Sequence, residues 1–381
     1  MVANIGTKLR PGPRARWRPA HRGLSAWFRG SRRQWSRLRR LAAWAVVFLL
    51  LGTMVSVLVV LTTSVSGVDQ RGTGNARPAA DRVNSNGDPF SGTQLFVDPS
   101  TPAARAEASL ERSNPAAAAL LRKIASHPAG IWFGSWIPVT EVAAAVGTVM
   151  REAEARHSMP LLVLYAFPYR GCEGDATAGS AETAAYERWI GQVVAGIGAG
   201  RAMVILEPDA LAEYIGLACL SPSEQQDRLM MIRRAVDQLV KLPNADVYLD
   251  AGNSRWKSVQ VMASLLLAAD IGKARGFSVN VSNFNSTADE ESYGDTLSAL
   301  LHGKHYVIDT SRNGAATATT WCNPPGQALG AAPTASTGNP LVDALLWIKP
   351  PWASDGTCNG GPPAGMFWLS YALSLARNAR W

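Results

Sequence analysis

The chain alternates short, continuous apolar runs with longer stretches in which apolar residues recur every three to four positions. Continuous apolar runs bounded by turn residues are typical of strands that are buried on both faces. Seven runs predict strands, at 130–136, 161–168, 202–209, 246–252, 277–283, 306–314 and 344–351. Between them, the stretches 182–197 and 223–242 have the period of amphipathic helices.

This alternation of strands and helices predicts a parallel sheet with the helices outside it. The fold class that we expect is α/β, a distorted seven-stranded parallel α/β barrel of the TIM-like type, because seven strands are one short of the usual eight. A doubly wound open sheet is the alternative. In a barrel of this kind the catalytic groups gather at the C-terminal ends of the strands.

The N-terminal region has a different pattern, which predicts four segments. Residues 1–40 form a basic arm, and residues 41–62 contain 21 consecutive uncharged residues, enough for a helix to cross a bilayer. Residues 63–93 are rich in Gly, Asn, Asp and Ser and predict a flexible linker, so residues 94–381 form the folded domain. By the positive-inside rule we expect a single-pass protein of the cell membrane with this domain outside. Secretion after cleavage near Ser66 is the alternative.

The charge of the chain excludes nucleic-acid binding as the function of the folded domain. The formal net charge is +8, but twelve of the 37 Lys and Arg lie in residues 1–40, which leaves 25 basic against 29 acidic groups elsewhere. The four cysteines lie in the exported part, where two disulfides in any of three pairings can form. Metal-ligand spacings do not occur in the sequence, so we expect neither a metal nor a cofactor.

Charged and amide side chains follow most of the predicted strands. Single acids at such positions are usually helix N-caps, and Asp209 before "ALAEY" could be one. Several of them at one rim point instead to a shared site with carboxylates in different environments. The candidates are Tyr169 with Arg170, Glu207, Asp209, Asp250, Asn280, Asn283, Asp309, Arg312, Lys349 and Asp355.

Tryptophans are a second feature of the predicted strand ends and loops. Each one separately is more often a core residue, but as a set beside carboxylates they suggest a carbohydrate-binding cleft, because a flat ring can stack on a sugar. They are Trp132, Trp136, Trp256, Trp321, Trp347 and Trp352.

Six ordered motifs then carry a family resemblance: "ILEPDALA" 205–212, "YLDAG" 248–252, "GFSVNVSNF" 276–284, "VIDTSRNG" 307–314, "WCNPPGQALG" 321–330 and "LWIKPP…SDGTC" 346–358. Over about residues 94–381 the chain resembles glycoside hydrolase family 6, the inverting cellobiohydrolases and endo-β-1,4-glucanases. The resemblance implies hydrolysis of a β-glucan without a metal.

The resemblance also implies roles for single residues. Asp209 matches the general acid, and Asp355 matches the residue proposed as the base or as the group that steers the water. Tyr165, Arg170, Asp250, Arg312 and Lys349 match supporting positions, and the sugar-binding candidates are Trp132, Asn253, Trp256, Asn280, Asn283, Trp321 and Trp352. It further implies disulfides between Cys172 and Cys219 and between Cys322 and Cys358. Inversion requires the two carboxyl groups to stand about 6.5–9.5 Å apart.

Three positions depart from the family pattern. Gly171 replaces an Asp that helps control the proton on the acid, Asn253 replaces a His, and Trp352-Ala353 replaces Gly-Glu. The sequence therefore leaves three hypotheses: a membrane-anchored β-glucanase with reduced or retuned catalysis, a hydrolase of a different envelope polysaccharide, or a glycan-binding pseudoenzyme. We expect a monomer whose partner is the polysaccharide.

Overall fold

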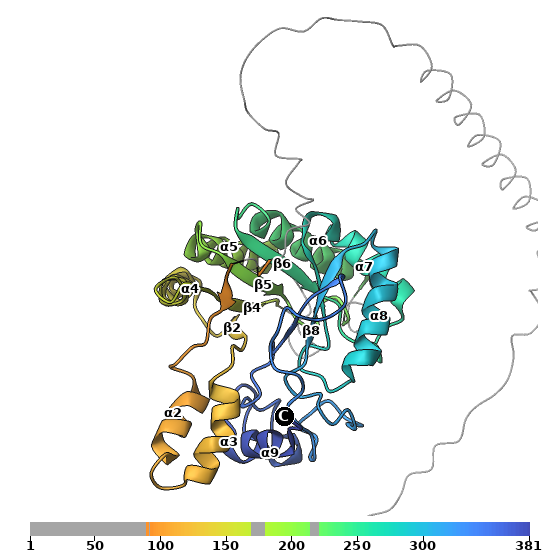
Figure 1. The fold of residues 1–381 in the computed structure, drawn as a ribbon. Coiled ribbons are helices and arrows are strands. Elements are labelled where there is room, and N and C mark those ends of the chain that lie inside the picture. The colour runs from red at the N-terminus through yellow and green to blue at the C-terminus, as the bar shows by residue number, and fades with distance from the viewer. Residues whose placement is uncertain (1–88, 91, 169–179, 214–220) are drawn as a thin grey trace, which may run out of the picture. The chain divides into compact units, whose positions relative to one another are not determined.

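The computed structural model describes residues 89, 90, 92–168, 180–213 and 221–381 (Figure 1). Its centre is one sheet of seven strands, each overlapping one of the seven predicted runs, with the last four strands beginning one or two residues earlier than predicted. They are β2 (Ile131–Gly134), β4 (Leu161–Tyr165), β5 (Ala202–Leu206), β6 (Ala245–Asp250), β7 (Gly276–Val279), β8 (His305–Asp309) and β9 (Val342–Leu346).

Neighbouring strands in this sheet are parallel and follow one another in chain order from β2 to β9. The order never reverses, which excludes the doubly wound alternative. The sheet curls until its two edges meet at one point: the N–H of Gly130, before β2, donates to the carbonyl of Trp347, after β9, at 2.8 Å. The Nε1–H of Trp132 donates to the carbonyl of Ile348 at 2.9 Å. The seven-stranded, incompletely closed barrel is therefore confirmed.

Both faces of the sheet are buried, which explains why the strands are continuous apolar runs. Alternate residues such as Val163, Ile205 and Tyr248 face the inside of the barrel and form one core. Their neighbours along the chain, such as Leu164 and Leu206, belong to a second core on the outer face.

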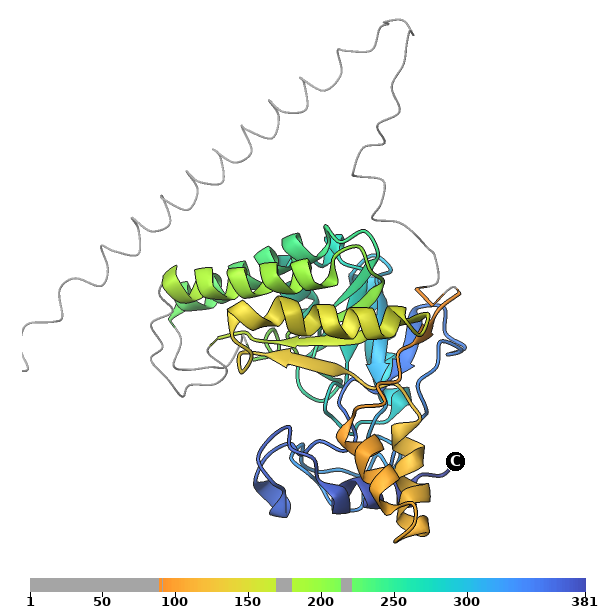
Figure 2. The ribbon, with the colours of Figure 1, turned by 90° about the vertical axis from the view of Figure 1, so that its left-hand side faces the viewer.

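Helices cover that outer face, as Figures 1 and 2 show. They are α4 (Val139–Glu154), α5 (Ser180–Ile197), α6 (Pro222–Leu239), α7 (Val259–Ala268) and α8 (Thr287–Leu300). Their starts follow ordinary capping chemistry. In α6, Ser221 and Glu224 form a reciprocal capping box and Pro222 takes the first helical position. The segments 182–197 and 223–242 are thus helical, the second ending three residues earlier than predicted.

A third core lies at the C-terminal ends of the strands, beneath the barrel in Figure 2. It joins α2 (Pro102–Leu110), α3 (Pro115–Ala125) and α9 (Leu369–Asn378), and α3 packs directly on α9. A two-stranded sheet of β1 (Gln94–Leu95) and β3 (Ser158–Met159) and the short 3-10 turns η2 (Ile271–Lys273) and η3 (Cys358–Gly360) complete the fold.

The predicted membrane segment, residues 41–62, lies outside the described residues together with the arm and most of the linker. None of the helices in the described part of the chain combines the length and apolar character that crossing a bilayer needs.

Candidate active site

Unusual backbone angles mark the C-terminal ends of two strands. Glu207 and Asp209 after β5, and Asn280 and Ser282 after β7, all have positive φ, between 51° and 74°. Residues with a Cβ seldom adopt this left-handed conformation, and such strain is concentrated at functional sites. The loops that leave β5 and β7 are therefore held in fixed, costly shapes at the rim where the sequence predicts the site.

The first carboxylate after β5, Glu207, ties two strand ends together. Its side chain is buried and accepts the backbone N–H groups of Ala166 and Phe167, after β4, at 3.0 and 3.1 Å. This pairing supplies acceptors for two buried N–H donors beyond the end of the strand ladder. Glu207 thereby fixes the loop in which Pro208 and Asp209 follow.

The second carboxylate, Asp209, is partly exposed and lies against Asp250, which is buried at the end of β6. The backbone N–H of Asp209 donates to Asp250 Oδ2 at 2.9 Å, and Gly252 N–H and the Ser278 hydroxyl add further bonds. Burial first, and the charge of Asp209 second, raise the pKa of Asp250 to about 8. Two neighbouring carboxyl groups of this kind do not both ionise readily, so the pair holds a proton at neutral pH.

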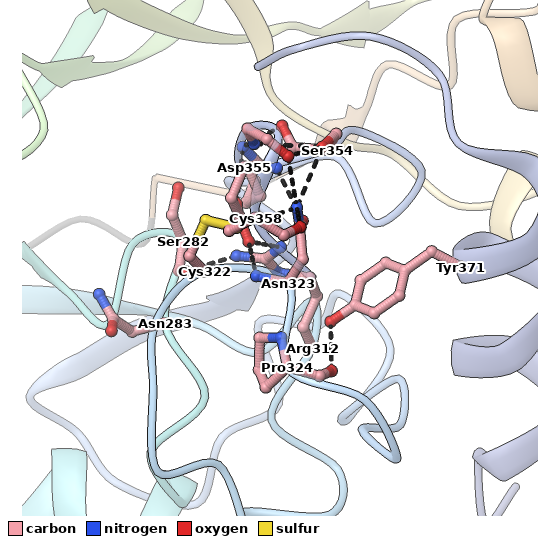
Figure 3. Close-up of polar contacts among 12 residues, drawn as sticks. Ser282, Asn283, Arg312, Cys322, Asn323, Pro324, Ser354, Asp355, Cys358 and Tyr371 are labelled. Atoms are coloured by element: carbon pink, nitrogen blue, oxygen red, sulfur yellow. Dashed lines mark hydrogen bonds and ion pairs between the residues drawn. A yellow bond between two sulfur atoms is a disulfide. The ribbon is translucent and has the colours of Figure 1, made fainter. Parts of the chain in front are cut away.

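Asp355 lies in a cluster of opposite character, which Figure 3 shows. Arg312 Nη1 contacts its Oδ2 at 2.8 Å, and Lys349 Nζ contacts its Oδ1 at 3.1 Å, with all three side chains at most 11% exposed. Burial alone would raise the pKa of Asp355, but the charges of Arg312 and Lys349 outweigh it and lower the pKa. Burial in turn lowers the pKa of Lys349, opposed by Asp355. Asp355 is thus an anion across the working pH range.

Asn323 completes that cluster and was not among the sequence candidates. Its backbone N–H donates to Asp355 Oδ2 at 3.0 Å, and its side-chain oxygen accepts the Asp355 backbone N–H at 2.8 Å. Its side-chain amide donates to the carbonyl of Gly356 and to Ser354. The only signal in the sequence was its place beside Cys322 in "WCNPPG".

A disulfide between Cys322 and Cys358 closes the same loops, as the resemblance implied. Because Asn323 follows one cysteine and Asp355 lies three residues before the other, this bond links the two partners covalently. The other implied pair, Cys172 and Cys219, lies outside the described residues, as do Tyr169, Arg170 and Gly171.

Asp309 joins the loops around this cluster. Its fully buried carboxylate accepts the backbone N–H groups of Ser282, Ser311 and Lys349 at 2.9–3.0 Å. These donors belong to the loops after β7, β8 and β9. Burial raises the pKa of Asp309, and the bonds from Ser311, Lys349 and Ser282 oppose this. Asp309 therefore fixes the backbone from which the side chains of Lys349 and Arg312 extend, although its own carboxylate is buried.

The asparagine candidates are placed mainly to shape loops. Asn280 is buried, donates to the carbonyls of Asn285 and Asp309, and accepts the N–H of Asn285. Asn283 is partly exposed and its side chain stands apart from the Asp355 cluster in Figure 3. Asn253 is 6% exposed, and its oxygen accepts the Asn285 amide at 3.0 Å. Contact of these side chains with a sugar remains a prediction.

The same Asn285 amide donates to the buried Glu290, which also accepts the hydroxyl and the N–H of Ser254. This network holds the loop after β6 against the start of α8. Neither Asn285 nor Glu290 was a sequence candidate.

The tryptophan candidates fall into two groups. Trp256 and Trp321 are 37% and 63% exposed, which leaves a ring face available to a ligand. Trp132 is partly buried at the inner face of β2, with its ring 5.2 Å from that of Tyr165 and 5.8 Å from Lys349 Nζ. Trp352 is only 7% exposed because it packs in the third core beside Tyr371. Its bulk supports the Asp355 loop, and little of its ring faces solvent.

Residues 90–379 match glycosyl hydrolases family 6. The chain belongs to this family. Among solved structures it is similar to the endoglucanase Cel6 from Mycobacterium tuberculosis in complex with methyl-cellobiosyl-4-deoxy-4-thio-β-D-cellobioside, with 45% identity, a TM-score of 0.71, and coverage of 77% of this chain and 99% of that one.

Curated relatives give the same picture. Endoglucanase A from Cellulomonas fimi is 43% identical over 287 residues, and the match spans 75% of this chain but 62% of that protein's length. Endoglucanase 1 from Streptomyces halstedii is 39% identical over 293 residues, spanning 74% of this chain and 88% of the relative. The predicted family and the predicted enzyme class, a glycoside hydrolase, are both confirmed.

Proposed function

We propose that the chain is an inverting hydrolase of β-1,4-glucan, in which Asp209 donates a proton to the leaving glycosidic oxygen and Asp355 organises the attacking water. The observation that carries this proposal is the contrast between the two carboxylate environments. The pKa of Asp250, beside Asp209, is raised, whereas that of Asp355 is lowered. One site that keeps a proton and one that stays ionised are what inversion by two carboxyl groups requires.

On the acid side, Asp250 acts through Asp209. A charge on Asp250 would be unfavourable next to an ionised Asp209, so protons are shared between the two carboxyl groups. When the shared proton lies on Asp209 it can pass to the leaving oxygen, and the pair then carries two negative charges until a proton returns from solvent. The Asp250 bond to the Asp209 backbone also holds the strained loop that aims Asp209.

On the water side, Asp355 is a weak proton acceptor because Arg312, Lys349 and the Asn323 N–H already bind its oxygens. Its fixed negative charge instead favours the positive charge that develops on the sugar, and it orients water toward the anomeric carbon. The proton released by that water then passes to solvent along bound water molecules or to Asp355.

The altered positions motivate a second candidate, cleavage of a different envelope polysaccharide or binding without cleavage. Asn253 is held by Asn285 in place of the His that the family pattern has there, and Ala353 follows the buried Trp352. These replacements change the packing of the loops after β6 and β9, while Asp209 and Asp355 remain. Endoglucanase relatives at 39–45% identity favour β-1,4-glucan as the first substrate to test.

We also propose that residues 41–62 anchor the protein in the cell membrane with the hydrolase domain outside. The uncharged 21-residue run after a basic arm supports this. Protease treatment of intact cells tests it: the domain is cleaved while the arm stays protected. Release of a soluble domain whose N-terminus lies after residue 62 would favour the secreted alternative.

The activity test compares wild-type protein with Asp209→Asn on carboxymethyl-cellulose and mixed-linkage glucan, scored by reducing ends. We expect the amide to lower the rate about 10²–10⁴-fold with little change in stability, because a general acid contributes by that factor. The variant Gly171→Asp, which restores the family's carboxylate, should raise the rate at least ~10-fold if the rest of the site is intact. If wild type and Gly171→Asp both bind glucans or envelope polysaccharides and neither cleaves any of them, the hydrolase is rejected.

A further inference from the structure

The loop after β2 carries Trp136, a member of the tryptophan set noted in the sequence to which no single role has been given. It is 60% exposed. Its position is nevertheless fixed. Ile137 N–H closes a tight turn onto the Gly134 carbonyl at 3.0 Å, and Trp189 of α5 donates to the Ile137 carbonyl at 3.2 Å.

The ring of Trp136 lies against Gly134, the last residue of β2. A Cβ at Gly134 would come within 2.1–2.6 Å of three atoms of the six-membered part of the indole. The ring is therefore in contact with the glycine backbone, at a distance that no other residue type permits without displacing it. One face of the ring is supported by the strand and the other remains available.

The alternation along β2 shows on which side of the sheet this ring lies. Trp132 and Gly134 are two residues apart, so their Cβ directions share a face, and Trp132 packs on the core inside the barrel. Tyr165 pairs with Gly134 in the parallel register and points the same way. Because the ring of Trp136 occupies the place of a Cβ on Gly134, it lies on the same side of the sheet as Trp132 and Tyr165, at the C-terminal end of β2.

A series of side-chain contacts leads from the inner face of β2 to Asp355. Trp132 lies against Tyr165 and beneath Lys349, and Lys349 binds Asp355. β2 is at the edge of the sheet, two strands away from β5, which leads to Asp209. A chain bound along the cleft past Tyr165 and Trp132 would therefore reach Trp136 after the sugars nearest the cleaved bond.

We propose that Trp136 is a stacking platform for an additional sugar ring of a bound β-glucan chain, at the β2 end of the cleft, and that Gly134 is the residue that seats it. The proposal rests on the proposed function. A rigid aromatic face costs little entropy to present, and a pyranose ring offers the apolar C–H face that stacks on it. Because this sugar is remote from the cleaved bond, the platform contributes to binding and leaves the chemical step unchanged.

The experiment uses the full-length protein in a mild detergent, with Asp209→Asn as the background for binding measurements by calorimetry. The ligands are cellotriose and cellohexaose. We expect Trp136→Ala to weaken cellohexaose binding about 10-fold, equivalent to about 1.4 kcal/mol, and cellotriose binding less than about 2-fold. Trp136→Phe should recover most of the loss. With Asp209 intact, KM for soluble glucan rises and kcat is retained.

Gly134→Ala gives an independent variant that keeps the tryptophan and displaces its ring. In the Asp209→Asn parent it should weaken cellohexaose binding when Trp136 is present and change nothing further when Trp136→Ala is also present, because the glycine acts through the ring. Leu267→Ala, at an exposed apolar residue of α7, is the matched control and should leave binding unchanged.

Each result decides between the claims. If the parent binds cellohexaose and Trp136→Ala binds it equally well, or loses both ligands to the same extent, the platform is wrong while the proposed function stands. If the Asp209→Asn parent binds in a manner that depends on Trp136, but the protein with Asp209 intact does not cleave glucan, the platform stands and the hydrolase is wrong. If the parent does not bind glucan and the protein with Asp209 intact does not cleave it, both are wrong.

Discussion

Replacing Asp250 by Asn changes how stability responds to pH, and the structure gives the sign of the effect. Asp250 is buried with its pKa raised to about 8, against an ordinary value of 3.8. In the folded state it keeps its proton between these two values, whereas in the unfolded chain it is ionised. Stability that is present in acid is therefore lost as the pH rises toward 8.

The size of the effect follows from the width of that window. Each pH unit inside it lowers the free energy of unfolding by about 1.4 kcal/mol, so passing from about pH 5 to pH 7.5 costs roughly 3 kcal/mol. Because Asp250 is fully buried, solvent does not reduce this figure. An asparagine does not titrate and keeps most of the contacts: its oxygen can accept the N–H groups of Asp209 and Gly252, and its amide can donate to the Ser278 hydroxyl.

The measurement is urea unfolding of wild type and Asp250→Asn at the two pH values. We expect the stability of the wild type, relative to the variant, to fall by about 3 kcal/mol from pH 5 to pH 7.5. Asp227→Asn, on the exposed face of α6, controls for the loss of one negative charge. A difference between wild type and Asp250→Asn that is the same at both pH values would refute a proton held at Asp250. The pH dependence of kcat/KM adds a second readout. Its basic limb reports loss of the shared proton, and this limb should shift when Asp250 is replaced by Asn.

Three further predictions concern residues that support the site or the barrel. Asn323→Ala should lower stability by about 1–3 kcal/mol, seen in thermal unfolding, and reduce kcat more than it changes KM, because the Asp355 N–H and the Gly356 carbonyl lose their side-chain partner while the backbone bond to Asp355 Oδ2 stays. The double variant Cys322→Ser and Cys358→Ser opens a loop of 36 residues and should cost about 3–4 kcal/mol by chain entropy, with peptide mapping to confirm the wild-type bond. Asp343→Ala should cost about 3–5 kcal/mol and leave kcat unchanged in the folded fraction, because it uncouples Arg275 at the opposite ends of the strands.

The strands could be predicted from the sequence because each is buried on two faces. A segment such as "AMVIL" in β5 contains no polar position that would allow another interpretation, and turn residues bound it. The helices were found for the same reason, from their apolar stripe. The third core was missed, because α2 and α3 are rich in alanine and their partner α9 comes more than 200 residues later in the chain.

The site was predictable only where a residue follows a strand. Asp209, Asp250 and Asp309 stand at strand ends, so the topology alone brings them to one rim. Asn323, Asn285 and Glu290 lie in loops or at a helix start, and their importance depends on partners that the local sequence does not name. Asn323 and Asp355 are 32 positions apart, and it is the disulfide and the turn at Asn323 that bring them together.

The division of labour between Asp209 and Asp355 follows from which strands deliver them. β5 and β6 are neighbours in the sheet. Asp250 ends β6 and Asp209 follows β5 by three residues, so a carboxyl pair forms there and burial makes it hold a proton. Arg312 and Lys349 follow β8 and β9 by three residues each, and both contact Asp355, which lies in the loop after β9. Burial acts on both carboxyl groups, and the charges that neighbouring strand ends bring to each of them decide how the two pKa values differ. The surroundings of each carboxyl group thus determine its role. If Lys349 and Arg312 were both removed, nothing would oppose the effect of burial and the pKa of Asp355 would rise. Asp355 would then take up a proton, while the proton held by Asp209 and Asp250 would be unaffected.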